Sequence, residues 1–114
     1  MNTQLNSVVL SGFAGTTPQI STFGNGKKMA RFTLATHESY KDKEGVWQSL
    51  TLWHQVITWG KLATKVEEII TSGVRLALKG KLKQRTWADK NGRVHYITEI
   101  LAGSVEIEGK AEAA

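Results

Sequence analysis

Hydrophobic and polar residues alternate along three segments in the first half of the chain, with the two-residue period of a half-buried β-strand. The three predicted strands are Leu5–Phe13, Met29–His37 and Ser49–Trp59. In the second strand Ala30, Phe32 and Leu34 share one face, which we predict to be the core side. The glycines of Phe23–Gly26 predict a turn, and the polar stretch Glu38–Gln48 is predicted to be an exposed loop.

The spacing then becomes helical. Hydrophobic residues recur on one helix face at Leu62, Val66, Ile69 and Ile70. Gly73 is predicted to end this helix in a left-handed conformation. Two further strands, Val74–Trp87 and Val94–Ile107, flank a hairpin tip at Asp89–Gly92. The core side of the first of them is predicted to carry Val74, Leu76, Leu78 and Leu82.

Three strands, one helix and two strands form the order of an OB-fold. The predicted class is therefore mainly β: a five-stranded OB-fold barrel with one α-helix between strands three and four. The length of 114 residues fits a single domain over residues 1–107, followed by a short disordered end at residues 108–114. A helix-capped sandwich is the alternative that this order leaves open.

Charge is unevenly distributed along the chain. The formal net charge is +5, which favours a polyanionic partner and also fits mere solubility. From Lys79 to Arg93 there are six bases against one acid, Asp89. From Glu99 to the end there are four acids against one base, Lys110. A polyanion is therefore expected to meet the first segment and to avoid the second.

The residue inventory argues against catalysis, metal binding and membrane insertion. There is no cysteine, and the three histidines (His37, His54 and His95) lie on separate predicted strands without a matching set of carboxylates. We therefore expect no enzyme activity, no metal and no cofactor. The polar start lacks a signal-peptide pattern, and no stretch approaches the ~20 apolar residues of a membrane span, so a cytoplasmic protein is expected.

Aromatic and basic residues share faces of the predicted strands. Trp53 and Trp59 are six residues apart, so both indoles lie on one face of their strand. The odd positions of the next strand carry Arg75, Lys79, Lys81, Lys83, Arg85 and Trp87. Flat rings beside rows of positive charge suit single-stranded nucleic acid. The alternatives are core tryptophans and a solvated basic face.

Longer strings of residues resemble the bacterial single-stranded DNA-binding proteins, from Asn6 to about Val105. The strings are Leu34-Ala35-Thr36, Glu38-Ser39-Tyr40-Lys41-Asp42-Lys43, Trp53-His54, Trp59-Gly60-Lys61-Leu62-Ala63, Gly80-Lys81-Leu82, Arg85-Thr86-Trp87 and Tyr96-Ile97-Thr98-Glu99. The resemblance implies an OB barrel that assembles into a homotetramer, a dimer of dimers, and coats single-stranded DNA during replication, recombination and repair, in the cytoplasm with the nucleoid.

Residue roles follow from the resemblance by position. Base stacking is implied for Tyr40, Trp53, Trp59 and Trp87. Backbone contact is implied for Lys41, Lys43, Lys61, Lys83 and Arg85, and Lys81 is added to this set from the basic stripe. His54 matches a position associated with subunit assembly. The family's linker and acidic Pro-Phe tail have no counterpart here, so tail-mediated recruitment of partners is not expected.

Two other functions remain open from the sequence. One is an adaptor similar to the small primosomal proteins, which would use the same barrel to hold replication proteins. The other is a cold-shock-like RNA-binding module, although the short aromatic strand motifs expected of it are missing. RNA therefore stays open as a second ligand beside single-stranded DNA.

Overall fold

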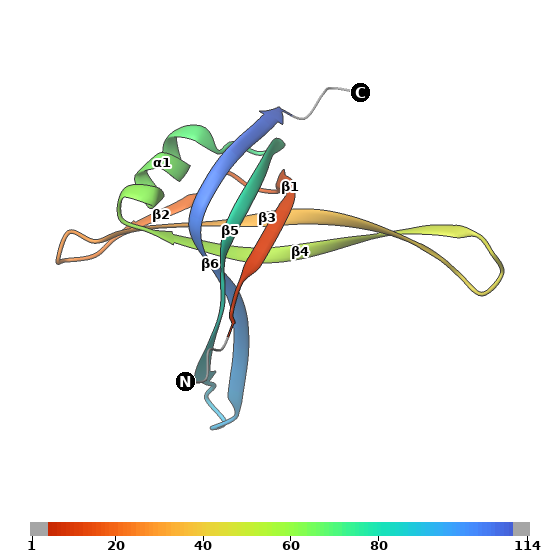
Figure 1. The fold of residues 1–114 in the computed structure, drawn as a ribbon. Coiled ribbons are helices and arrows are strands. Elements are labelled where there is room, and N and C mark those ends of the chain that lie inside the picture. Colours follow the sequence, from red (N-terminus) through yellow and green to blue (C-terminus); the bar gives the residue numbers. More distant parts are fainter. Residues whose placement is uncertain (1–4, 111–114) are drawn as a thin grey trace.

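Five strands close into a barrel in the computed structural model, which describes residues 5–110 (Figure 1). They are β1 (Val8–Ala14), β3 (Lys28–Lys41), β4 (Trp47–Trp59), β5 (Val74–Ala88) and β6 (Val94–Lys110). The sheet order is β1-β5-β6-β4-β3, and pairing of β1 with β3 at Phe13 and Ala14 closes the barrel. The predicted OB-fold barrel is confirmed. A short additional strand, β2 (Gln19–Thr22), pairs with β3 and was not predicted.

The one helix within residues 5–110, α1 (Lys61–Ile69), lies between β4 and β5, which are the third and fourth strands of the barrel. Its hydrophobic face covers one end of the barrel with Ala63 and Val66 fully buried. The prediction that Gly73 ends the helix is wrong, although the predicted left-handed backbone of Gly73 is confirmed. Helical geometry stops at Ile69 because Ile70 turns into the core with extended backbone, and Gly73 (φ 89°) forms the turn into β5.

The barrel interior is filled by alternate residues of the strands. Phe32, Leu34 and Leu76 are essentially inaccessible to solvent, which confirms the predicted core faces of β3 and β5. Leu82 is an exception, because its side chain is half exposed. The two extra residues of β6 shift its register against β5, and Gly80 lies so close to β6 that a Cβ there would be 2.2 Å from the Leu101 carbonyl oxygen. Beyond this point β5 leaves the barrel.

Two hairpins project from the barrel as arms (Figure 1). The β3–β4 arm comprises residues 38–50 and the β5–β6 arm residues 83–97. The prediction of a loop at Glu38–Gln48 is therefore wrong, since pairing continues to Lys41 opposite Trp47 and leaves a turn at residues 42–46. Both faces of the arm are exposed, so the alternation typical of a half-buried strand is missing. Strand β6 also passes its predicted end at Ile107, and residues 111–114 lie outside the described part.

Candidate nucleic-acid interface

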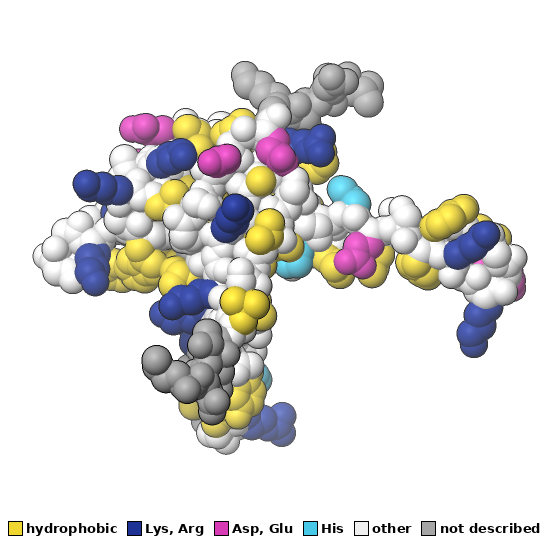
Figure 2. Space-filling model, in the orientation of Figure 1, with side chains coloured by type: hydrophobic (Ala, Val, Ile, Leu, Met, Phe, Trp, Pro, Cys, Tyr) yellow, Lys and Arg dark blue, Asp and Glu magenta, His cyan; other side chains and the backbone are white. Residues whose placement is uncertain are grey.

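An open groove of about 280 Å³ lies on the outer surface of the barrel, between the β2–β3 turn and the base of the β5–β6 arm. Its lining includes Phe23, Arg31, Trp59, Lys83, Arg85 and Glu99. A second opening at the β2–β3 turn adjoins it through Phe23 and Trp59. In Figure 2 this side of the barrel shows basic and hydrophobic side chains, and the visible acidic ones on the barrel body lie toward α1 and the C-terminal end of β6. The groove therefore combines apolar rings with positive charge.

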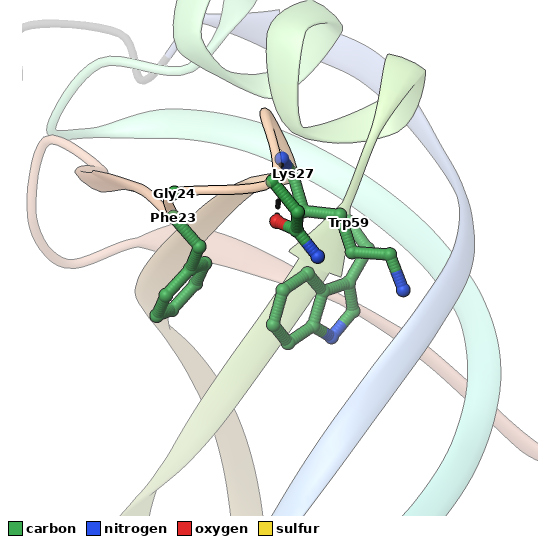
Figure 3. Close-up of a pocket in the computed structure, with 5 residues that line it drawn as sticks. Phe23, Gly24, Lys27 and Trp59 are labelled. Carbon is green, nitrogen blue, oxygen red and sulfur yellow. Dashed lines mark hydrogen bonds between the residues drawn. The ribbon is translucent and has the colours of Figure 1, made fainter.

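Trp59 is held at the edge of this groove by a neighbouring ring. Its indole stacks on Phe23 with ring centroids 5.7 Å apart and planes 29° apart. Figure 3 shows the two rings side by side beneath the turn, with Lys27 beside Trp59. Trp59 is 41% exposed, so much of its indole surface is free to contact a ligand. A base could stack on this surface without unfolding any element.

Trp53 lies on the same outer face of β4, as its six-residue spacing from Trp59 predicts. The side chain is 62% exposed, so the alternative that it is a core residue is wrong. Its ring is seated against Gly15, where a Cβ would come within 2.4 Å of the indole. Across the strand it pairs with Ala35, whose small side chain leaves room for the ring. The Trp53 indole is therefore exposed on one side and packed against Gly15 on the other.

Trp87 lies on the β5–β6 arm and is stacked on one face. His95, directly opposite on β6, covers the indole at 4.3 Å between centroids and 18° between planes. His95 Nε2 in turn lies 2.8 Å from Asp89 Oδ2. The pKa of Asp89 is lowered chiefly by the hydrogen bond with His95. Hydrogen bonds from the backbone amides of Arg93 and Asn91 lower it further. This chain of contacts fixes the indole while leaving it 46% exposed.

The basic stripe predicted for β5 is divided by the fold. Lys83 and Arg85 line the groove. Lys81 lies in a separate opening beside Asn6 and Gly80. At the other end of the strand, the Nε of Arg75 is 3.8 Å from the Glu108 carboxylate. The basic residues of β5 therefore lie in different surroundings along the strand, because β5 curves around the barrel.

Glu99 belongs to the acidic C-terminal segment that a polyanion is predicted to avoid, and that avoidance stays a prediction. This residue is 3% exposed and lies in the basic groove rather than away from it. Its carboxylate accepts a hydrogen bond of 2.7 Å from Arg85 Nε and lies 3.5 Å from Arg31 Nη2. Pairing of β6 with β5 and β4, and of β4 with β3, brings these residues together, which charge counting along the sequence could not reveal.

The remaining predicted contacts are not among the residues that line the groove. Tyr40, Lys41 and Lys43 belong to the β3–β4 arm, and Lys61 begins α1. The ammonium of Lys41 lies 5.6 Å from the ring centre of Trp47, which is 67% exposed. Tyr40 pairs with Gln48, so by strand alternation it occupies the opposite face of the arm from Trp47. The predicted site residues thus form several separate clusters.

His54 is half-buried, and its Nε2 lies 3.0 Å from the Thr36 hydroxyl. Its role in subunit assembly stays a prediction, since the structure contains one chain. Within residues 5–110 no group of three or more His, Cys, Asp or Glu side chains is arranged to hold a metal ion. In the same range no helix is long and apolar enough to cross a membrane.

Sequence reasoning missed three contributors to the interface. Phe23 supports Trp59, and His95 supports Trp87. Arg31 was not among the predicted phosphate contacts, yet it lies in the groove beside Glu99. Arg31 alternates along β3 with the core residues Ala30 and Phe32, so the spacing places its side chain on the outer face. The spacing gives no information on the partners of Arg31 in distant strands.

Comparison with known proteins agrees with this geometry. The model of the Single-strand binding protein family matches residues 5–108. The chain is similar to single-stranded DNA-binding protein 1 of Chlorobaculum tepidum, with 36% identity over 110 residues, covering 96% of this chain and 68% of the relative.

Solved structures give the same result. A chain of a Plasmodium falciparum SSB complex with ssDNA superposes with a TM-score of 0.87 at 28% identity, covering 94% of this chain and 97% of that one. A deletion mutant of the Thermus aquaticus single-stranded DNA binding protein shares the fold, with a TM-score of 0.80 at 20% identity over 90% of this chain and 50% of that chain. The chain belongs to the single-strand binding protein family.

Proposed function

We propose that this protein binds and coats single-stranded DNA without catalysis and without strong sequence preference. The observation that carries the proposal is the set of exposed indoles of Trp53, Trp59 and Trp87, of which Trp59 lines the groove together with basic side chains. The relative named above and the complex with ssDNA support the same ligand. The corresponding cellular role is protection of single strands during replication, recombination and repair, in the cytoplasm of a bacterium.

The residue roles within this function are proposals as well. Stacking on bases is assigned to Tyr40, Trp53, Trp59 and Trp87, all of which are 41% or more exposed. Contacts with phosphates are assigned to Lys41, Lys43, Lys61, Lys81, Lys83 and Arg85. Stacking is worth about 1–3 kcal/mol per base, and every base has a π-face, so weak sequence preference follows.

Coating of long strands also requires several barrels, because one barrel accommodates about 4–16 nucleotides. We propose a homotetramer built as a dimer of dimers, with His54 near a subunit contact. Support comes from β1, whose residues 8–12 pair along one edge with β5 and have no second strand partner within the described part of the chain. Val9 on this strand is 65% exposed. An open, apolar edge suits pairing across a two-fold axis.

Titration of tryptophan fluorescence tests the proposal. Oligo-dT should quench the emission at far lower concentration than duplex DNA of equal length, because duplex bases cannot reach the indoles. Single-stranded RNA is titrated in parallel to measure the DNA preference. Equal binding of duplex and single strand at moderate salt would refute the proposal. No binding of either, with capture of replication proteins instead, would favour the adaptor function.

A further inference from the structure

The groove contains one buried acid among its basic residues. Glu99 on β6 is 3% exposed, and its two carboxylate oxygens face two arginines from different strands. Oε1 accepts from Arg85 Nε on β5 at 2.7 Å, and Oε2 lies 3.5 Å from Nη2 of Arg31 on β3. The carboxylate thus connects the two sides of the groove beneath Trp59.

The two arginines retain donors beyond these contacts. A guanidinium has five N–H groups in a fixed plane, and Glu99 engages few of them. The side chains of Arg31 and Arg85 are 35% and 46% exposed, so their outer edges reach solvent at the groove. An anion bound in the groove would find oriented donors on both sides.

We propose that Glu99 is a positioning residue that aims the guanidinium groups of Arg31 and Arg85 at one phosphate of a single strand whose base stacks on Trp59. This inference rests on the proposed function and adds Arg31 to the phosphate-binding residues. A fixed guanidinium pair loses little conformational freedom on binding, since Glu99 already restricts both side chains. Arginine recognises phosphate through parallel N–H donors, so its orientation matters as much as its charge.

The proposal reverses the effect expected from charge alone. An acid in a DNA-binding groove repels phosphate, so its removal should strengthen binding if it acts only through its charge. If it positions two arginines, its removal should weaken binding despite the gain of one positive charge. Glu99→Gln keeps the size and shape of the side chain while removing the charge. The direction of the change in affinity therefore separates the two roles.

The experiment compares Glu99→Gln with Glu106→Gln, which removes one exposed acid from the same strand. Both variants and the unmodified protein are titrated with oligo-dT over a range of salt concentrations. We expect Glu106→Gln to bind equally or more tightly and Glu99→Gln to bind on the order of tenfold more weakly. The log–log salt slope of Glu99→Gln should fall by about 0.7, one phosphate contact on a single strand. Binding by Glu99→Gln as tight as by Glu106→Gln would overturn the proposal.

A second pair of variants keeps the test decisive if Glu99→Gln does not fold. Arg31→Ala should lower the salt slope by about 0.7. Lys28→Ala removes one charge from the same strand, but Lys28 pairs with Glu67 of α1, so its slope should change less. Equal slopes for the two variants would refute the role of Arg31. If the unmodified protein itself fails to bind oligo-dT, the proposed function fails; if it binds and the variants do not differ, this inference alone fails.

Discussion

The β3–β4 and β5–β6 arms end in the same turn but carry different side chains. In each turn an aspartate, Asp42 or Asp89, accepts hydrogen bonds of 2.8–2.9 Å from the amides two and four residues later. In each a glycine with positive φ follows three residues after the aspartate, Gly45 (φ 81°) and Gly92 (φ 78°). The two hairpins therefore reverse direction through the same type of turn.

The side chains of the two arms differ in net charge and in the contacts that support their aromatic rings. Residues 38–50 hold two lysines against three acids, whereas residues 83–97 hold four bases against one acid. On the β5–β6 arm Trp87 is stacked on His95. On the β3–β4 arm the ring of Trp47 has Lys41 above it instead.

This difference separates turn formation from binding. Equivalent tips show that an arm can be built from its turn and pairing alone, so the surface residues are free to serve a ligand. Only the β5–β6 arm combines a supported ring with a positive field. If single-stranded DNA follows both attractions, this arm should contribute more to affinity and nearly all of the salt dependence that comes from the arms.

Substitution of the arm tryptophans should give the largest effect. Trp87→Ala is expected to weaken oligo-dT binding by about 1–3 kcal/mol, because a stacked base is lost from the basic arm. Trp47→Ala should cost less, since its arm carries a net negative charge and Lys41 already lies over its ring. Both affinities are measured by titration at one salt concentration.

The thermal midpoint of each variant is the control. Both indoles lie outside the barrel core, so neither substitution should shift the midpoint by much. An equal loss of affinity in the two variants would show that single-stranded DNA contacts both arms alike. The larger contribution expected of the β5–β6 arm would then be refuted.

The salt dependence of binding should also differ between the two arms, with a smaller effect than the tryptophan substitutions. Lys83→Ala, at the base of the β5–β6 arm, should lower the log–log slope by about 0.7 for one lost phosphate contact. Lys41→Ala should change the slope less, because its arm carries a net negative charge. A series of titrations between low and moderate salt measures both slopes. A larger change for Lys41→Ala would assign the phosphate path to the β3–β4 arm.

The two arms also mark how far the sequence alone could lead. Asp89–Gly92 was predicted as a hairpin tip because strands with clear patterns flank it. Glu38–Gln48 was predicted as a loop, although its tip has the same chemistry, because both faces of that arm are exposed and hydrophobic alternation disappears. The placement of Trp53 and Trp59 on one face of their strand followed from strand parity, a local property. The contacts of Glu99 with Arg31 and Arg85 depend on pairing between distant strands, which no local pattern encodes.

The smallest expected effect concerns the acid titration of the two tips. The pKa of Asp42 is lowered chiefly by the Val46 amide and then by Gln48, and that of Asp89 chiefly by His95. Since both folded-state pKa values lie below 3.8, the stabilisation is complete above that pH and is lost as the pH falls through the folded-state values. Carboxyl carbon NMR should give both midpoints below 3.8.

His95→Ala distinguishes the two aspartates in this titration. It should raise the midpoint of Asp89 toward 3.8 because it removes the largest cause of the lowered pKa, and it should leave Asp42 unchanged. Gln48→Ala is the matched variant on the other arm, and its effect on Asp42 should be smaller because the Val46 amide remains. An unchanged Asp89 midpoint in His95→Ala would mean that His95 does not donate to this carboxylate in solution. The position of the Trp87 indole against His95 would then depend on ring stacking alone.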